Sequence, residues 1–326
     1  MADGALVVST SPAPPELFQG ALPEGTQVVR AGAEELAALA GEADIIIGDW
    51  EHRVQVDAAT LQMATRCRLV QQPSAGYENV DVAAADAAGI PVANAGPANS
   101  AAVAEHAVMG ILGCLRQLRE AIADAERGGW DGQRWVAKDL GDLYQSTVGI
   151  LGFGAIGQAI AQRLVGFGTE TLYNKRTRLE APEEDALHAV YVELDQLLRR
   201  SEVLVVALPL NPVTRGLLSA ERLAMLPAGA IVVNISRGDV IDERALADAL
   251  RSGRLGGAAL DVFSVEPLPV GHDLGSLPNV LLTPHIAGAT AQSKRNILMN
   301  SITNVARVLR GEAPLYVVNH PGERRG

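Results

Sequence analysis

Short apolar runs alternate along most of the chain with Ala- and Leu-rich amphipathic stretches, and this alternation limits the possible folds more than any other feature. Such alternation is typical of a parallel sheet covered by helices, because each parallel connection needs a crossover. The strand-like runs form two groups, separated by a helical stretch at about 100–127. They are residues 5–9, 27–30, 44–48, 68–71 and 90–93, then 146–151, 170–173, 203–208, 230–234, 257–260 and 280–283. The sequence therefore predicts an α/β protein with two doubly wound parallel sheets.

Composition and charge narrow the classes of partner. With 326 residues, 48 % of them apolar, the chain is long enough for two domains with separate cores. Its net charge of −11 and its scattered basic residues argue against a nucleic-acid or anionic-membrane partner. Cys67 and Cys114 have no CxxC spacing, so neither a disulfide framework nor a bound metal is expected. The N-terminus does not resemble a signal peptide and no stretch is apolar enough to cross a bilayer, which predicts a cytoplasmic protein.

A glycine-rich turn joins the strand at 146–151 to a helix at 158–165. It reads Gly152-Phe-Gly154-Ala155-Ile156-Gly157. The first glycine of such a turn permits a tight bend, the second lets a pyrophosphate approach the backbone, and the third lets helix and strand pack closely. The helix N-terminus adds N–H donors and a positive dipole. In this strand–turn–helix setting the motif predicts a dinucleotide site.

The next strand ends at Tyr173 and leads into Asn174, Lys175 and Arg176. A site for NAD usually has an acidic residue here, which binds the ribose 2′-hydroxyl. Lysine and arginine would instead pair with the 2′-phosphate of NADP, which a carboxylate would repel. The sequence therefore favours NADP, with NAD as the alternative.

Three further segments follow later strands, on the side where ligands bind to open α/β sheets, and they contain Arg237, Glu266 and His285. Reduction of a 2-oxo acid needs a cation to clamp the carboxylate, which suits arginine. It also needs an acid to protonate the forming alkoxide, which suits histidine. A carboxylate can hold that imidazole and favour its charged form. The three side chains therefore predict hydride transfer between a nicotinamide and a small 2-oxo or 2-hydroxy acid.

The sequence resembles the D-isomer-specific 2-hydroxyacid dehydrogenase family, and in particular its glyoxylate/hydroxypyruvate reductases, over nearly its whole length. Several motifs in the order of the family are far more specific than any one of them alone. They are Gly76-Tyr-Glu-Asn-Val-Asp81, Ala102-Val-Ala-Glu-His106, the glycine-rich turn, Leu208-Pro-Leu-Asn-Pro-Val-Thr-Arg215, Asn234-Ile-Ser-Arg-Gly238, Ala259-Leu-Asp-Val-Phe263 with Glu266-Pro267, and Thr283-Pro-His-Ile-Ala-Gly288.

The resemblance implies a role for each matching position. His285 would be the acid/base, Glu266 would orient it, and Arg237 would bind the substrate carboxylate and keto oxygen. Asp261 would contact the nicotinamide carboxamide. Backbone N–H groups around Ser74, Ala75 and Gly76 would hold the carboxylate from the other domain. The implied cofactor-binding residues are Gly152, Gly154, Ala155, Ile156, Gly157, Asn174, Lys175, Arg176, Leu208, Pro209, Thr214, Ile235, Asp261 and Gly288.

The resemblance also implies how the chain is divided. A flavodoxin-like substrate-binding domain would comprise residues 1–98 and 289–326, including a last helix from about 290 to 310. A Rossmann dinucleotide-binding domain at 99–288 would be inserted into it. Family members are commonly homodimers with the helical region at 101–127 in the interface, so a homodimer is expected. His106, on a mainly apolar helix, is expected to serve packing or that interface.

Two alternatives to a 2-oxo acid reductase remain open. Phosphite dehydrogenases resemble this chain and share the three side chains, but they carry a lysine just before the Gly-Tyr pair, where this sequence has Ala75. A corepressor-like protein that senses NAD(P)H is the non-enzymatic alternative, although the sequence shows no peptide-docking surface. For a reductase, the polar and cation-poor stretch at 71–74 favours short mono-acids such as glyoxylate, hydroxypyruvate or pyruvate over dicarboxylates.

Overall fold

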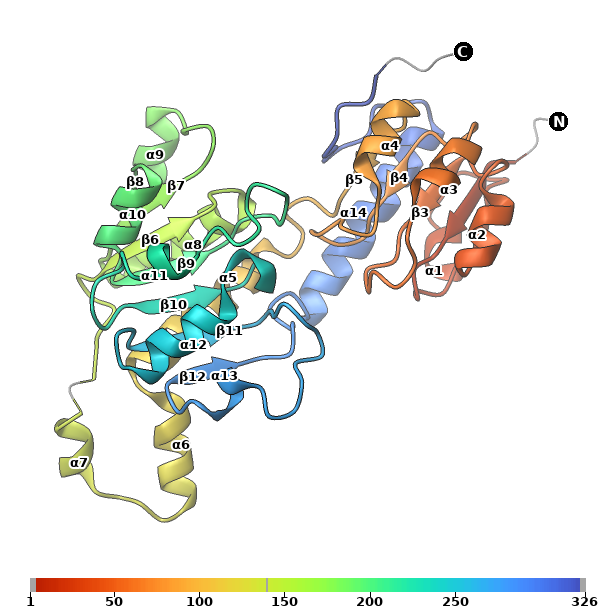
Figure 1. Ribbon diagram of the computed structural model, residues 1–326. Coiled ribbons are helices and arrows are strands. Elements are labelled where there is room, and N and C mark those ends of the chain that lie inside the picture. Colours follow the sequence, from red (N-terminus) through yellow and green to blue (C-terminus); the bar gives the residue numbers. More distant parts are fainter. Residues whose placement is uncertain (1–3, 139, 323–326) are drawn as a thin grey trace. The chain divides into compact units, whose positions relative to one another are not determined.

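The computed structural model describes residues 4–138 and 140–322. The chain divides into two compact units: unit 1 is Met1–Asn99 with Ala291–Gly326, and unit 2 is Ser100–Thr290. Unit 2 is therefore inserted into the sequence of unit 1. Each unit is an α/β structure with a parallel sheet, which confirms the predicted fold class (Figure 1). Among the residues that the structure describes, every helix is too short or too polar to span a bilayer.

Unit 1 is built on a five-stranded parallel sheet with the order β2-β1-β3-β4-β5. This is the flavodoxin-like order. Its strands are β1 (Leu6–Ser9), β2 (Gln27–Arg30), β3 (Ile45–Ile47), β4 (Val70–Gln71) and β5 (Val92–Ala93). Its helices are α1 (Glu16–Gln19), α2 (Ala33–Leu39), α3 (Ala58–Met63), α4 (Val82–Ala87) and α14 (Ala291–Leu309).

Both faces of this sheet are buried, and the alternation of side chains along β3 shows how. Ile46 packs into a core with residues of α2, α3 and α4 on one face. Ile45 and Ile47 pack on the other face with Ile302 and Val305 of α14. The last long helix of the chain thus completes the core of the first sheet, which explains why the segment after unit 2 returns to unit 1.

Unit 2 is built on a seven-stranded parallel sheet with the order β12-β11-β10-β9-β6-β7-β8. The strand order reverses between β6 and β9, and ligands of such sheets bind at the carboxyl ends of the strands at this point. The strands are β6 (Thr147–Leu151), β7 (Glu170–Asn174), β8 (Ala189–Tyr191), β9 (Val203–Val206), β10 (Ile231–Asn234), β11 (Gly257–Leu260) and β12 (Val280–Leu282). The α-helices are α5 (Ser100–Leu115), α6 (Leu118–Glu126), α7 (Gly132–Val136), α8 (Ala155–Leu164), α9 (Ala181–Leu187), α10 (Leu194–Arg200), α11 (Ala220–Leu223), α12 (Glu243–Arg251) and α13 (Asp273–Ser276).

Helix α5 packs closely across β10, β11 and β12. Two glycines allow this approach, because a Cβ on Gly110 would lie 2.8 Å from the Cβ of Ala259, and one on Gly113 would lie 2.6 Å from Leu281. The helical stretch predicted at about 100–127 is present as two helices, α5 and α6. Gln117 takes a left-handed conformation with φ of 45° and separates α5 from α6.

Candidate active site

The glycine-rich turn lies between β6 and α8, at the carboxyl edge of the sheet. Gly152 has φ of 97°, which disfavours a side chain, and a Cβ there would lie 2.6 Å from the carbonyl oxygen of Ala207. A Cβ on Gly157 would lie 2.4 Å from the carbonyl oxygen of Gly152, so this glycine lets α8 pack against the turn. A Cβ on Gly154 would meet no atom within 4 Å. The open side at Gly154 and the N-terminus of α8 together fit a pyrophosphate.

The loop after β7 is anchored by contacts that the sequence analysis did not identify. The hydroxyl of Tyr173 donates to Oε1 of Glu184 at 2.5 Å and accepts the N–H of Leu179 at 3.0 Å. Arg178 donates from two nitrogens to the two oxygens of Glu184, at 2.9 and 2.7 Å. The hydrogen bonds from Arg178 and then Tyr173 lower the pKa of Glu184 to about 2, against its burial. The guanidinium of Arg178 is therefore paired with Glu184 and is not available to bind a ligand.

Lys175 and Arg176 lie in the same loop. The amide of the preceding Asn174 donates to the carbonyl oxygen of Val192 at 2.8 Å. Within residues 4–138 and 140–322, neither Lys175 nor Arg176 forms a side-chain hydrogen bond or an ion pair. Positive charge next to the glycine-rich turn is therefore available for an anionic group of a ligand.

Arg237 follows β10 in a turn that the buried Asn234 organises. Oδ1 of Asn234 accepts both the N–H and the hydroxyl of Ser236, at 3.0 and 2.8 Å, and its amide donates to the carbonyl oxygen of Arg237 at 3.0 Å. At the next position, a Cβ on Gly238 would lie 1.9 Å from the carbonyl carbon of Phe263. The turn that carries Arg237 therefore packs directly against the loop that follows β11.

Glu266, on that loop, pairs with His285, whose side chain is 48 % exposed. Oε2 of Glu266 lies 2.8 Å from Nδ1 of His285, and Oε1 accepts the N–H of Phe263 at 2.9 Å. Burial acts to raise the pKa of Glu266. The hydrogen bonds from His285 and Phe263, with the charges of His285 and Arg237, outweigh burial and lower the pKa of Glu266. Because Glu266 occupies Nδ1, Nε2 is the ring atom left to exchange a proton with a ligand.

Asp261, only 2 % exposed, holds the backbone around His285. His285 has φ of 53°, and a left-handed conformation costs a non-glycine residue about 1–3 kcal/mol. Its N–H donates to the carbonyl oxygen of Asp261 at 2.8 Å. The carboxylate accepts the N–H groups of Ile286 and Ala287 at 2.9 and 2.8 Å and the hydroxyl of Thr283 at 2.6 Å. Hydrogen bonds to a charged group contribute about 1.5–3 kcal/mol each, so Asp261 can offset the strain at His285.

The other residues predicted to bind the cofactor also belong to unit 2, close to the carboxyl ends of its strands. They are Ala155 and Ile156 in the first turn of α8, Leu208, Pro209 and Thr214 after β9, Ile235 after β10, and Gly288 after β12. The hydroxyl of Thr214 donates to the carbonyl oxygen of Pro209 at 2.7 Å, which fixes the loop after β9.

Ser74, Ala75 and Gly76 form a turn after β4 in unit 1, whereas Arg237, Glu266 and His285 belong to unit 2. The hydroxyl of Ser74 donates to the carbonyl oxygen of Gly76 at 2.6 Å and accepts the amide of Gln72 at 2.9 Å. Nε2 of His52 lies 3.3 Å from the same hydroxyl. Within the described parts of the chain, the backbone N–H groups of Ser74, Ala75 and Gly76 have no acceptor, so this turn can donate to an anion.

The sequence was compared with known protein families and with solved structures. The family model described as D-isomer specific 2-hydroxyacid dehydrogenase, NAD binding domain, matches residues 108–287. The chain belongs to the D-isomer-specific 2-hydroxyacid dehydrogenase family.

Curated relatives and a solved structure agree with this assignment. A glyoxylate reductase of Thermococcus onnurineus is 39 % identical over 81 % of this chain and 80 % of its own length. Glyoxylate/hydroxypyruvate reductase B of Erwinia tasmaniensis is 37 % identical over 81 % of this chain and 83 % of its own. The crystal structure of a glyoxylate reductase from Paecilomyes thermophila superposes with a TM-score of 0.88 at 29 % identity, covering 98 % of this chain and 99 % of the other.

As a member of the D-2-hydroxyacid dehydrogenase family, the chain is a nicotinamide-dependent oxidoreductase that acts on the CH–OH group of 2-hydroxy acids and on the corresponding 2-oxo acids. The relatives favour neither the phosphite dehydrogenase nor the corepressor alternative. In the part of the dehydrogenase that the structure describes, no group of His, Cys, Asp and Glu side chains is placed to hold a metal ion.

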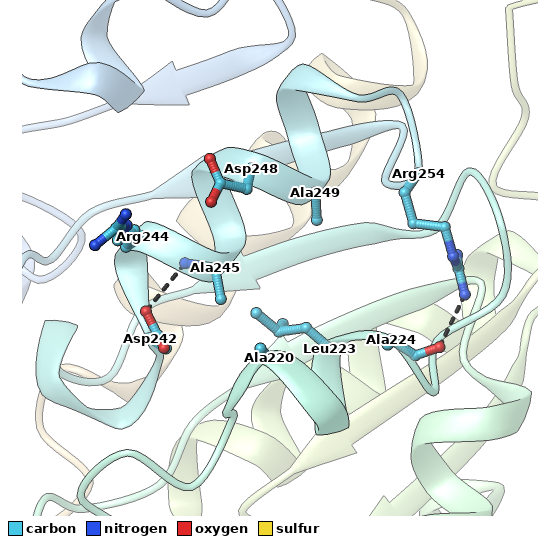
Figure 2. Close-up of a pocket in the computed structure, with 9 residues that line it drawn as sticks. All are labelled: Ala220, Leu223, Ala224, Asp242, Arg244, Ala245, Asp248, Ala249 and Arg254. Atoms are coloured by element: carbon cyan, nitrogen blue, oxygen red, sulfur yellow. Dashed lines mark hydrogen bonds between the residues drawn. The ribbon is translucent and has the colours of Figure 1, made fainter.

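A separate cavity of about 280 Å³ lies between α11 and α12 of the dehydrogenase (Figure 2). Asp242 caps α12 there by accepting the N–H of Ala245 at 3.0 Å, and Arg254 donates to the carbonyl oxygen of Ala224 at 3.0 Å (Figure 2). None of the site residues described above lines this cavity. It is a groove between two helices that cover the sheet, and it is not part of the active site.

Proposed function

We propose that this dehydrogenase reduces short 2-oxo mono-acids, glyoxylate or hydroxypyruvate, with a preference for NADPH and with D-specificity where the product is chiral. The observation that carries the proposal is the pair formed by Glu266 and His285, 2.8 Å apart, on loops that follow β11 and β12 of the nucleotide-binding unit. The glyoxylate and hydroxypyruvate reductases among the relatives support the substrate class.

The chain's own residues then divide the chemistry. The nicotinamide, when bound, supplies the hydride. Arg237 binds the substrate carboxylate and keto oxygen, for which a planar guanidinium is suited. His285 protonates the forming alkoxide from Nε2, because Glu266 holds Nδ1. The ionised Glu266 stabilises the imidazolium, and in the oxidative direction the neutral imidazole accepts the hydroxyl proton.

We assign the two ligands to the two units. Unit 2 would hold the dinucleotide through the open side of Gly154, the other predicted cofactor residues and Asp261, which would meet the carboxamide. Unit 1 would be the substrate-binding domain, and the N–H groups of Ser74, Ala75 and Gly76 would bind the substrate carboxylate. The side chain of Gln72 is already bonded to Ser74, so residues 71–74 offer little to a second anionic group. This supports mono-acids over dicarboxylates.

The preference for NADPH rests on the loop after β7. Asn174 stands where NAD sites usually have an acid. Lys175 and Arg176 keep their charges available, while Glu184 holds Arg178 away from this role. Lys175 and Arg176 are therefore the proposed partners of a 2′-phosphate, with Asn174 beside them.

We also propose that the protein is a homodimer. Helix α6 and the segment that joins it to α7 in unit 2 expose apolar side chains, including Leu118, Ile122 and Trp130, the last of which is 85 % exposed. A second copy of the chain would bury this surface. Size-exclusion chromatography with light scattering should give twice the monomer mass, and a monomer at micromolar concentration would contradict the proposal. The cytoplasmic location stays a prediction.

Initial rates with NADPH and NADH, in parallel, against glyoxylate, hydroxypyruvate, pyruvate and oxaloacetate test the proposed activity. Oxidation of NADPH should be faster than that of NADH, and fastest with glyoxylate or hydroxypyruvate. Equal rates with both cofactors would remove the NADPH preference and leave the reaction class. No turnover of any 2-oxo acid would overturn the proposed activity, and phosphite oxidation would be measured next.

A further inference from the structure

His106, on α5, contacts the loop that carries His285. Its Nε2 lies 2.9 Å from Oγ1 of Thr283 and 3.6 Å from Oδ1 of Asp261, and its side chain is 16 % exposed. We propose that His106 is a positioning residue for the reaction, which acts on His285 through Thr283 and Asp261. This role replaces the packing or interface role expected from the sequence. It rests on the proposed function, in which His285 is the acid.

The hydrogen bonds among His106, Thr283 and Asp261 have a defined donor-to-acceptor direction. Thr283 has one hydroxyl proton, which goes to Oδ1 of Asp261 at 2.6 Å, since an ionised carboxylate only accepts. The Thr283 oxygen must then accept the contact from His106, so Nε2 of His106 carries a proton. His106 therefore donates to Thr283, which donates to Asp261. Hydrogen bonds in such a chain strengthen one another, so the first donor affects how firmly Asp261 is held.

The position of the Asp261 carboxylate in turn fixes the backbone on both sides of His285. The N–H groups of Ile286 and Ala287, the two residues after His285, both donate to its carboxylate. Because His285 has φ of 53°, its backbone relaxes toward a commoner conformation when these bonds weaken. A rotation of Asp261 would therefore move the imidazole away from the substrate while leaving the fold intact.

The packing of α5 makes His106 a fixed point for this chain of contacts. Gly110 and Gly113 follow His106 at one and two turns, and they bring the helix against Ala259 of β11 and Leu281 of β12. These strands lead directly into Asp261 and Thr283. The helix cannot shift to follow the loop, so His106 holds Thr283 in one position relative to the sheet.

Two substitutions of His106 separate positioning from packing. His106→Leu replaces the imidazole with an apolar side chain of similar size and removes the donor, whereas His106→Gln places an amide N–H near the position of Nε2. We expect His106→Leu to lower kcat for glyoxylate about tenfold, the factor that one lost hydrogen bond produces, with KM changed less than about twofold. His106→Gln should recover most of kcat. If His106→Gln is as slow as His106→Leu, or if only KM changes, the proposal is wrong.

A double-mutant cycle and a stability control sharpen this test. His106→Leu and Thr283→Val remove opposite ends of one contact, so the double variant should be no slower than the slower single variant. Fully additive losses would contradict the proposal. Ile111→Val, in the buried part of the same helix, lowers the stability of the core without touching the contact, and should leave kcat unchanged.

A measurement without substrate keeps this inference separate from the proposed activity. The chain has six histidines, so ¹⁵N-histidine NMR gives a small set of ring signals that single variants assign. His106 should be in the Nε2–H tautomer, and His106→Leu should shift the ring signals of His285, whereas Ile111→Val should not. An Nδ1–H tautomer for His106, or unmoved His285 signals, would overturn the inference even in an active enzyme. If the signals behave as expected but no 2-oxo acid is reduced, the proposed function alone fails.

Discussion

Oε2 of Glu266 lies 2.8 Å from Nδ1 of His285, and this contact leaves Nε2 as the ring nitrogen open to a ligand. The two residues come from loops after neighbouring strands, β11 and β12, which pair in parallel with Leu260 opposite Leu282. Because neighbouring parallel strands end at the same edge of the sheet, the loops that follow them bring the carboxylate and the imidazole together. Asp261 then fixes the backbone of His285, so both the ring and its main chain are held before a substrate binds.

His285→Ala tests the proposed acid directly. Removal of a general acid typically costs 10²–10⁴-fold in rate, so kcat for glyoxylate reduction should fall within that range. The Kd of NADPH, measured by fluorescence titration, should stay within about threefold, because the glycine-rich turn is on a different loop. A rate close to that of the wild type would remove His285 from the mechanism.

Glu266→Gln should move the pH dependence of reduction. The reductive direction needs a protonated His285, and the negative charge of Glu266 favours that form. The amide variant should therefore lose reductive activity at lower pH than the wild type. The pKa of Glu266 lies below its ordinary value of 4.5, so the wild type should keep the pair as pH falls through 4.5. Superimposable pH profiles of kcat/KM would contradict the assigned role of Glu266.

Much of the fold was predictable, because apolar runs of strand length are visible in the sequence. The predictions failed where the local pattern carried no signal. Strand β8 has only three residues at the edge of its sheet and was not predicted. The break at Gln117 was missed because neither glycine nor proline marks it, although the residue takes φ of 45°. The last helix, expected at about 290–310, is α14 at Ala291–Leu309.

In the candidate site, too, only those residues that a local sequence pattern marks could be predicted. Arg237, Glu266 and His285 were predicted because each lies in the loop that follows a strand, and the end of a strand is a local property of the sequence. The contact between His106 and Thr283 joins residues 177 positions apart, so no local pattern could show it. A histidine on an apolar helix suggested packing instead. Arg178 and Glu184 are only six positions apart, but an arginine near a glutamate is too common to signal an anchored loop.

Lys175→Ala with Arg176→Ala should separate the two cofactors. Loss of charge-assisted contacts to a phosphate should raise KM for NADPH about tenfold to a hundredfold and leave KM for NADH nearly unchanged. Arg199→Ala removes an exposed cation on α10 and serves as the control, with both KM values unaffected. An equal rise in KM for NADH and for NADPH would show that the two residues do not bind the 2′-phosphate.

Glu184→Gln should change how stability depends on pH. The pKa of Glu184 is lowered from 4.5 to about 2 by the hydrogen bonds from Arg178 and Tyr173. A carboxyl with a depressed pKa in the folded state contributes stability that is complete above pH 4.5 and is lost as pH falls toward 2. The variant should therefore have a lower Tm at neutral pH and a smaller loss of Tm on acidification. Asp185→Asn, an exposed change of the same charge on the same helix, is the control. Parallel Tm curves for wild type and Glu184→Gln would count against the anchored loop.

Gly154→Ala and Gly157→Ala should fail in different ways, although they change two glycines of one motif. A Cβ on Gly157 would lie 2.4 Å from a backbone oxygen, which cannot yield without moving α8, so this variant should lose several degrees of Tm even without cofactor. A Cβ on Gly154 would meet nothing within 4 Å, and φ of −82° suits an alanine, so its Tm should match the wild type. Its methyl group would instead occupy the place where a pyrophosphate approaches, and the Kd of NADPH should rise at least tenfold. Calorimetry of both variants with and without NADPH distinguishes the two effects. Tight NADPH binding by Gly154→Ala would mean that the pyrophosphate does not lie over this turn.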